Sequence, residues 1–111
     1  MNQQETGSIM TIALMAAFAD GAKDDSERAA VKQLAETLDP EGTLNLAALY
    51  REVLLAPPDL AAVAGALQSA GTRQLAYEMA VGVCDADGVQ NAGEREFLAR
   101  LATALGLPAA Q

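Results

Sequence analysis

The sequence contains an internal repeat, in which residues 12–38 align without a gap on residues 79–105. Nine of the 27 aligned positions are identical, namely Ala13/Ala80, Ala19/Ala86, Asp20/Asp87, Gly21/Gly88, Glu27/Glu94, Arg28/Arg95, Leu34/Leu101, Ala35/Ala102 and Leu38/Leu105. Self-similarity at a fixed separation is typical of folds built from repeated supersecondary units. The repeat therefore predicts two equivalent helical hairpins that are related by a pseudo-twofold axis.

Composition and periodicity predict an all-α fold. Hydrophobic residues make up 51% of the chain, and much of this share is alanine, whereas aromatic residues make up 4%. Alanine is the best helix former, and no stretch shows the period-two alternation of a half-buried strand. We expect a single-domain bundle of about six helices over residues 9–108, with residues 1–8 disordered or frayed.

Caps and breaks define the expected helices. Ser8, Asp59 and either Thr43 or Asn45 are suited to cap a following helix, and Pro57-Pro58 ends one. Helices are expected over residues 9–19, 25–38, 45–55, 60–69 and 73–85, with a sixth from after Asn91 to Leu105. The third of these is expected to turn Leu46, Leu49, Val53 and Leu54 toward the core.

The equivalent helices at 9–19 and 73–85 are expected to pack together at the centre of the bundle. The first is apolar on nearly every side, which is typical of a helix surrounded by others. Small residues such as Ala13, Ala80 and Gly82 would allow the two backbones to approach closely. The helices at 25–38 and 92–105 are then expected to lie outside this central pair.

The charge of the chain excludes several classes of partner. The net charge is −8, and the seven basic residues are scattered rather than clustered, which argues against nucleic acid and against anionic membrane surfaces. The longest apolar stretch, 9–19, is about half the ~20 residues that a membrane-spanning helix needs. No basic region precedes Ile9, as a signal peptide would require. We expect a cytoplasmic protein whose partner is another protein.

The chain lacks the residues of most nucleophilic active sites. It contains no histidine, which excludes Ser-His and Cys-His designs and removes the commonest zinc ligand. Its single cysteine, Cys84, lies in an apolar run and is expected to be a small buried hydrophobe. These observations favour a protein that is not an enzyme.

Each repeat carries an Asp-Gly pair followed by further polar side chains. An acid or amide comes four residues after the Asp, and a Glu comes seven residues after it. Hard cations such as Ca²⁺ take several oxygen ligands at about 2.3–2.6 Å. The candidate metal ligands are Asp20, Asp24, Glu27, Asp87 and Glu94, with Asn91 standing where the first repeat has an acid. The pattern suggests a divalent metal site, for which Ca²⁺ is the favoured ion.

Two other interpretations of these residues remain open. Asp24 with Glu27, and Asn91 with Glu94, have the spacing of capping boxes, in which both side chains serve the helix N-terminus. A metal-dependent hydrolase could also use a pair of carboxylates in its active site. An EF-hand does not fit, because a loop starting at Asp85 would have Gln90 where glycine is required.

The motifs resemble the TerB-like superfamily of helical bacterial domains, named for tellurite-resistance proteins. The resemblance rests on Ala19-Asp20-Gly21 with Glu27-Arg28 and on Ala86-Asp87-Gly88 with Glu94-Arg95. The segments Leu54-Leu55-Ala56-Pro57-Pro58-Asp59-Leu60 and Glu96-Phe97-Leu98-Ala99-Arg100-Leu101-Ala102 are most similar to the uncharacterised YebE-type branch.

This resemblance implies a function as well as a fold. It implies an all-helical bundle in which acidic residues of the two Asp-Gly loops gather in a negatively charged region that binds a divalent metal. On this chain the implied ligands are again Asp20, Asp24, Glu27, Asp87 and Glu94. The implied role is that of a non-enzymatic stress-associated or scaffold protein. A ligand-free protein–protein interaction module is the alternative, and a metal-dependent hydrolase is the third hypothesis.

Overall fold

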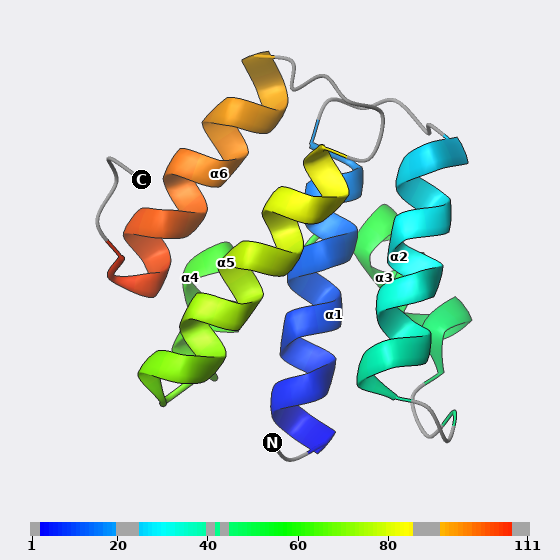
Figure 1. The fold of residues 1–111 in the computed structure, drawn as a ribbon, viewed down its shortest axis with the longest axis horizontal. Helices are drawn as coiled ribbons and strands as arrows, with labels where there is room; N and C mark the ends of the chain where they lie inside the picture. Colours follow the sequence, from blue (N-terminus) through cyan, green and yellow to red (C-terminus); the bar gives the residue numbers. More distant parts are fainter. Residues whose placement is uncertain (1–2, 20–24, 40–41, 43–44, 86–91, 108–111) are drawn as a thin grey trace.

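The structure, a computed structural model, describes residues 3–19, 25–39, 42, 45–85 and 92–107. These residues form an all-α bundle of six helices (Figure 1). The helices are α1 (Gln3–Ala17), α2 (Asp25–Leu38), α3 (Leu46–Leu55), α4 (Leu60–Gly65), α5 (Ala70–Cys84) and α6 (Ala92–Leu105). Within the described part of the chain, no helix has the length and apolar character needed to cross a membrane.

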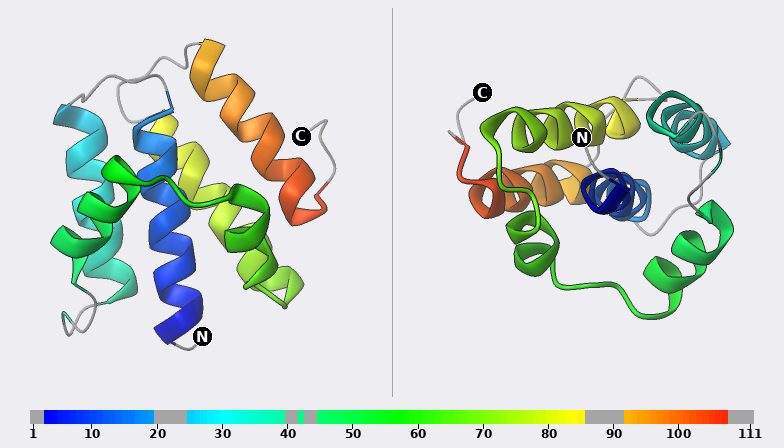
Figure 2. Two further views of the ribbon diagram at one scale, coloured as in Figure 1. Left: turned by 180° about the vertical axis from the view of Figure 1, so that it is seen from behind. Right: turned by 90° about the horizontal axis from the view of Figure 1, so that it is seen from below.

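Helix α1 forms the centre of the bundle. It contacts each of the other five helices, and the end-on view in Figure 2 shows it surrounded by them. Ile9, Met10, Ile12, Leu14 and Ala16 are at most 1% exposed. A helix that is apolar on nearly every side can bury all its faces only in such a position, so the composition of α1 determines its place.

The predicted pairing of the two equivalent helices is confirmed. Helix α5 makes the most extensive contact with α1, while α2 packs on α1 and α6 packs on α5. Ala13, Ala16, Ala76 and Ala80 are all fully buried, as close packing of small side chains requires. Each repeat therefore folds into a helical hairpin, and the first helices of the two hairpins form the central pair (Figure 1).

Most helix boundaries follow the capping residues. Asn45 caps α3, its Oδ1 accepting a 3.0 Å hydrogen bond from the Ala48 amide, and Asp59 caps α4. Helix α6 ends as expected at Gly106, whose φ of 74° lies in the left-handed region that glycine adopts most readily. The Leu107 amide then donates a 2.8 Å hydrogen bond back to the Ala102 carbonyl.

The N-terminal boundary differs from the prediction. Helix α1 begins at Gln3, so residues 3–8 are helical and neither disordered nor frayed, and Ser8 lies inside the helix instead of capping it. Thr6 is 7% exposed, which shows that this polar first part of α1 also packs against the bundle. Burial against neighbouring helices outweighs the polar character of the segment.

The connection between α4 and α5 also differs. Helix α4 ends at Gly65 and α5 begins at Ala70, whereas we expected helices over residues 60–69 and 73–85. Ser69 caps α5, because its Oγ accepts a 3.1 Å hydrogen bond from the Thr72 amide. The cap therefore starts the helix earlier and includes Gly71 in its first turn.

Two residues do not have the surroundings that the sequence pattern predicted. Leu54 was expected to face the core, but it is 43% exposed, whereas Val53, which was also expected there, is buried at 3%. Gly82 was expected to allow α1 and α5 to approach closely, but it is exposed, and a Cβ atom added there would have no neighbour within 4 Å. The close approach depends on the alanines alone.

Candidate functional site

Four helix ends lie at the same end of the bundle, which we call the Asp-Gly end. The C-terminal ends of α1 and α5 and the N-terminal ends of α2 and α6 all lie at the upper end of Figure 1. The contacts of α1 with α2 and α5, and of α5 with α2 and α6, hold these helices together. The helix ends that flank both Asp-Gly segments of the sequence therefore lie at one end of the bundle, with the ends of α1 and α5 between those of α2 and α6.

The backbone at this end supplies charges of both signs. The N-termini of α2 and α6 carry partial positive charge and favour nearby carboxylates, while the C-termini of α1 and α5 end in carbonyl groups with partial negative charge. Carboxylates and carbonyls are both ligands of hard cations. The arrangement is chemically compatible with a cation held between acidic side chains.

Glu94 is the candidate ligand whose side chain the structure describes. It is the third residue of α6 and is only 1% exposed, whereas Glu96 in the same helix is exposed. Burying a carboxylate is costly unless its charge is compensated, and the nearby N-terminus of α6 compensates part of it. A capping box does not require this burial, so the packing of α6 against its neighbours accounts for the position of the Glu94 side chain.

The other predicted ligands cannot be assigned positions. Asp20, Asp24 and Asp87 lie outside the described residues, as does Asn91. Glu27 belongs to the first turn of α2, but its side chain also lies outside the described part. Among the described side chains, no group of three or more His, Cys, Asp or Glu residues could hold a metal ion. The five-residue metal site thus stays a prediction, as do the two capping boxes.

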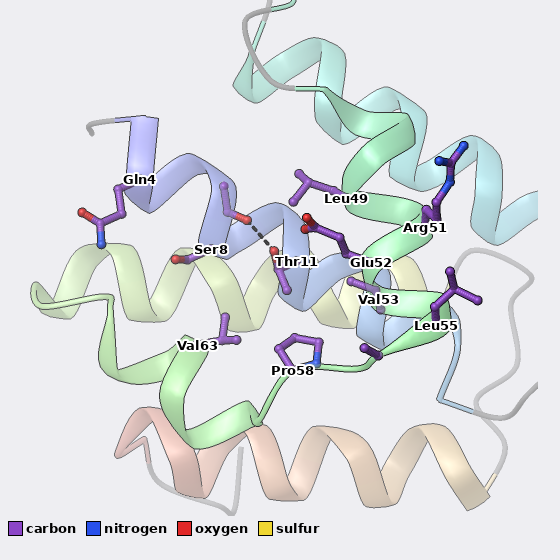
Figure 3. A pocket seen from close by; sticks show the side chains of 12 residues that line it. Gln4, Ser8, Thr11, Leu49, Arg51, Glu52, Val53, Leu55, Pro58 and Val63 are labelled. Carbon is purple, nitrogen blue, oxygen red and sulfur yellow. Dashed lines mark hydrogen bonds between the residues drawn. The ribbon is translucent and has the colours of Figure 1, made fainter.

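A concave surface, which the sequence did not predict, lies between α1, α3 and α4 (Figure 3). We call it the α1–α3–α4 groove. Its volume is about 650 Å³, and its lining includes Gln4, Ser8, Thr11, Glu52, Val53 and Val63. The sequence signal that points toward it is Leu54-Leu55, which is separated from Pro57-Pro58 only by Ala56, because the prolines separate α3 from α4 and leave the two leucines at a helix end.

Apolar side chains dominate the groove and its border. Leu55, which lines it, is 75% exposed, and the neighbouring Leu54 is 43% exposed. The Thr11 hydroxyl donates a 2.8 Å hydrogen bond to the Gly7 carbonyl within α1, so this polar group is already satisfied. A cleft of several hundred Å³ that is lined mostly by apolar side chains is a common form of binding site.

Comparison with known proteins places the chain in a family. The family profile described as "Protein of unknown function (DUF533)" matches residues 1–111. No curated protein and no solved structure shows significant similarity to the chain. The match covers the whole sequence, and the all-α bundle agrees with the resemblance noted from the two Asp-Gly motifs. The chain therefore belongs to the DUF533 family, which is part of the TerB-like superfamily.

Proposed function

We propose that this protein is a non-enzymatic, cytoplasmic bacterial scaffold domain of the stress-associated kind, related to the YebE-type branch, and that it binds a divalent cation at its Asp-Gly end. The observation that supports this proposal best is that the four helix ends flanking the two Asp-Gly segments lie at the same end of the bundle. These helix ends flank the acidic segments of both repeats, so ligands from both could serve one cation-binding region.

The proposed ligands are carboxylates from both hairpins. Asp20, Asp24 and Glu27 would come from the first repeat, and Asp87 and Glu94 from the second. Five carboxylates near one another repel, and a hard cation relieves this repulsion. The cation would hold the two hairpins together by electrostatic attraction and would not act on a substrate. The sequence contains no histidine, which fits a role without catalysis.

Calorimetric titration of chelator-treated protein tests the cation proposal. Ca²⁺, Mg²⁺ and Zn²⁺ are titrated separately, and we expect Ca²⁺ to bind most tightly. A set of five carboxylates suits the many oxygen ligands and flexible geometry of Ca²⁺, whereas Mg²⁺ keeps several waters and Zn²⁺ favours nitrogen and sulfur ligands. The proposal is wrong if none of the three ions binds below about millimolar concentration, the weak end of the range of protein Ca²⁺ sites. A preference for Zn²⁺ would refute the assignment of the ion.

The α1–α3–α4 groove supports a second candidate function, that of a protein–protein interaction module that needs no ligand. The groove has a volume of about 650 Å³ and a mostly apolar lining, which includes the exposed Leu55 at its border, and clefts of this size and composition commonly bind other molecules. This candidate does not exclude the first, because the groove and the Asp-Gly end involve different residues. Binding of a helical peptide in the groove tests the interaction function.

A further inference from the structure

We propose that the α1–α3–α4 groove binds an amphipathic helix of a partner protein, and that this helix carries basic residues beside its apolar stripe. The inference rests on the interaction function proposed above and specifies the chemistry of the partner. It does not depend on the cation site. Three properties of the groove support it: its shape, the charge at its border and the net charge of the whole chain.

The dimensions of the groove suit a short helical segment. One wall follows α1 from Gln4 through Ser8 to Thr11, which is two helical turns or about 10 Å at 1.5 Å per residue. Val53 and Val63 contribute apolar surface from α3 and α4 (Figure 3). Helices that bind in grooves use apolar anchors spaced by three, four and seven residues, and two turns accommodate one such set.

The charge beside the groove selects a basic partner. Glu52 and Arg51 are the charged residues among those that line it. Figure 3 shows the Glu52 side chain directed toward α1 across the groove, whereas the Arg51 side chain points away from α1. A helix lying against Val53 and Val63 would therefore meet a carboxylate on the α3 side. A Lys or Arg beside the apolar stripe of that helix could pair with Glu52.

The net charge makes a second copy of this chain an unsuitable occupant. Each copy carries a charge of −8, so association of two copies works against strong mutual repulsion. The same charge attracts a basic helix over long distances and accelerates its binding. Apolar contact with the exposed Leu55 would then add affinity that does not depend on salt.

Two synthetic peptides test the proposal. The first is a fluorescent helix of about 18 residues, or ~27 Å, with leucines at helical spacing and lysines beside them; the second has glutamates in place of the lysines. Binding to the full chain is measured by fluorescence anisotropy at physiological salt. We expect the lysine peptide to bind and the glutamate peptide to bind at least about tenfold more weakly, which corresponds to ~1.4 kcal/mol.

Two charge-reversal variants locate the binding site. Glu52→Lys removes the proposed partner of the lysines, and Glu78→Lys makes the same change in net charge on α5, where Glu78 is exposed and does not line the groove. Both residues are exposed, so both variants should fold, which circular dichroism verifies. We expect Glu52→Lys to weaken binding of the lysine peptide about tenfold and Glu78→Lys to weaken it by less than about threefold.

The remaining outcomes separate this inference from the function on which it rests. Equal loss in both variants would show unspecific attraction and would overturn the inference. If both peptides bind equally and Leu55→Ser abolishes binding, the interaction function stands and the basic partner is wrong. If neither peptide binds, both are wrong. If sedimentation shows a dimer that Leu55→Ser dissociates, the occupant is a second copy and the inference is refuted.

Discussion

The rings of Phe18 and Tyr50 meet edge to face, with their centroids 5.1 Å apart and their planes inclined by 73°. Phe18 directly follows α1, and Tyr50 lies in the middle of α3. The contact thus joins the C-terminal end of α1, close to the Asp-Gly end of the bundle, to the helix that forms one wall of the α1–α3–α4 groove. The contact fixes the position of α3 on the end of α1, and Tyr50 lies between Leu49 and Arg51, which both line the groove.

A double-mutant cycle measures the strength of this link. Edge-to-face pairs contribute about 0.5–1.5 kcal/mol beyond the area that they bury. We expect Phe18→Leu and Tyr50→Leu each to lower the free energy of unfolding, and the double variant to lose about 1 kcal/mol less than the sum of the single variants. Denaturant unfolding of the four proteins provides the values. Additivity within about 0.3 kcal/mol would mean that the rings do not interact.

Gly82→Ala is predicted to stabilise the protein by about 0.5–1 kcal/mol. Gly82 lies inside α5, is exposed, and leaves space for a Cβ atom, so alanine removes only the entropic cost of glycine in a helix. Ala80→Leu, two residues earlier in α5, is the contrasting variant. Ala80 is fully buried, so the larger side chain should destabilise by about 1–3 kcal/mol. Thermal unfolding that ranks the two variants in the opposite order would contradict the described packing of α5.

Val53→Ala and Leu55→Ala are predicted to differ in stability although they lie two residues apart in α3. Val53 is 3% exposed, and its truncation should cost about 1–3 kcal/mol. Leu55 is 75% exposed, so its truncation should change the free energy of unfolding by no more than about 0.5 kcal/mol. A large loss at Leu55 in urea unfolding would show that this side chain belongs to the core, and the groove border would have to be redefined.

The fold could be predicted further than the sites because helix periodicity and capping act locally. The repeat predicted the pairing of α1 with α5, and Asn45 and Asp59 predicted the starts of α3 and α4. The exposure of Leu54 was not predictable in this way. Four apolar residues of α3 fit an inner face, and only the position of α3 on the bundle decides which of them become buried.

The two candidate sites depend on tertiary arrangement. The α1–α3–α4 groove combines Ser8, Glu52 and Val63 from three helices, and no local pattern relates such positions. The burial of Glu94 depends likewise on how α6 lies against its neighbours, whereas the sequence pattern indicated a metal ligand or a capping residue and gave no information on burial. At the Asp-Gly end, the sequence shows that acidic residues are repeated, but it does not show the distances between them.

The central proposal, that the Asp-Gly end binds a cation, is tested most directly by the melting temperature with and without Ca²⁺. The wild type is compared with Glu94→Gln, which keeps the shape of the buried side chain, and with Glu96→Gln, a control on the exposed side of α6. A ligand at 100 times its dissociation constant stabilises the folded state by about 2.7 kcal/mol, which raises the melting temperature by several degrees. We predict this rise for the wild type and Glu96→Gln and a much smaller one for Glu94→Gln. An unchanged melting temperature of the wild type, or an equal rise in all three proteins, would contradict the proposal.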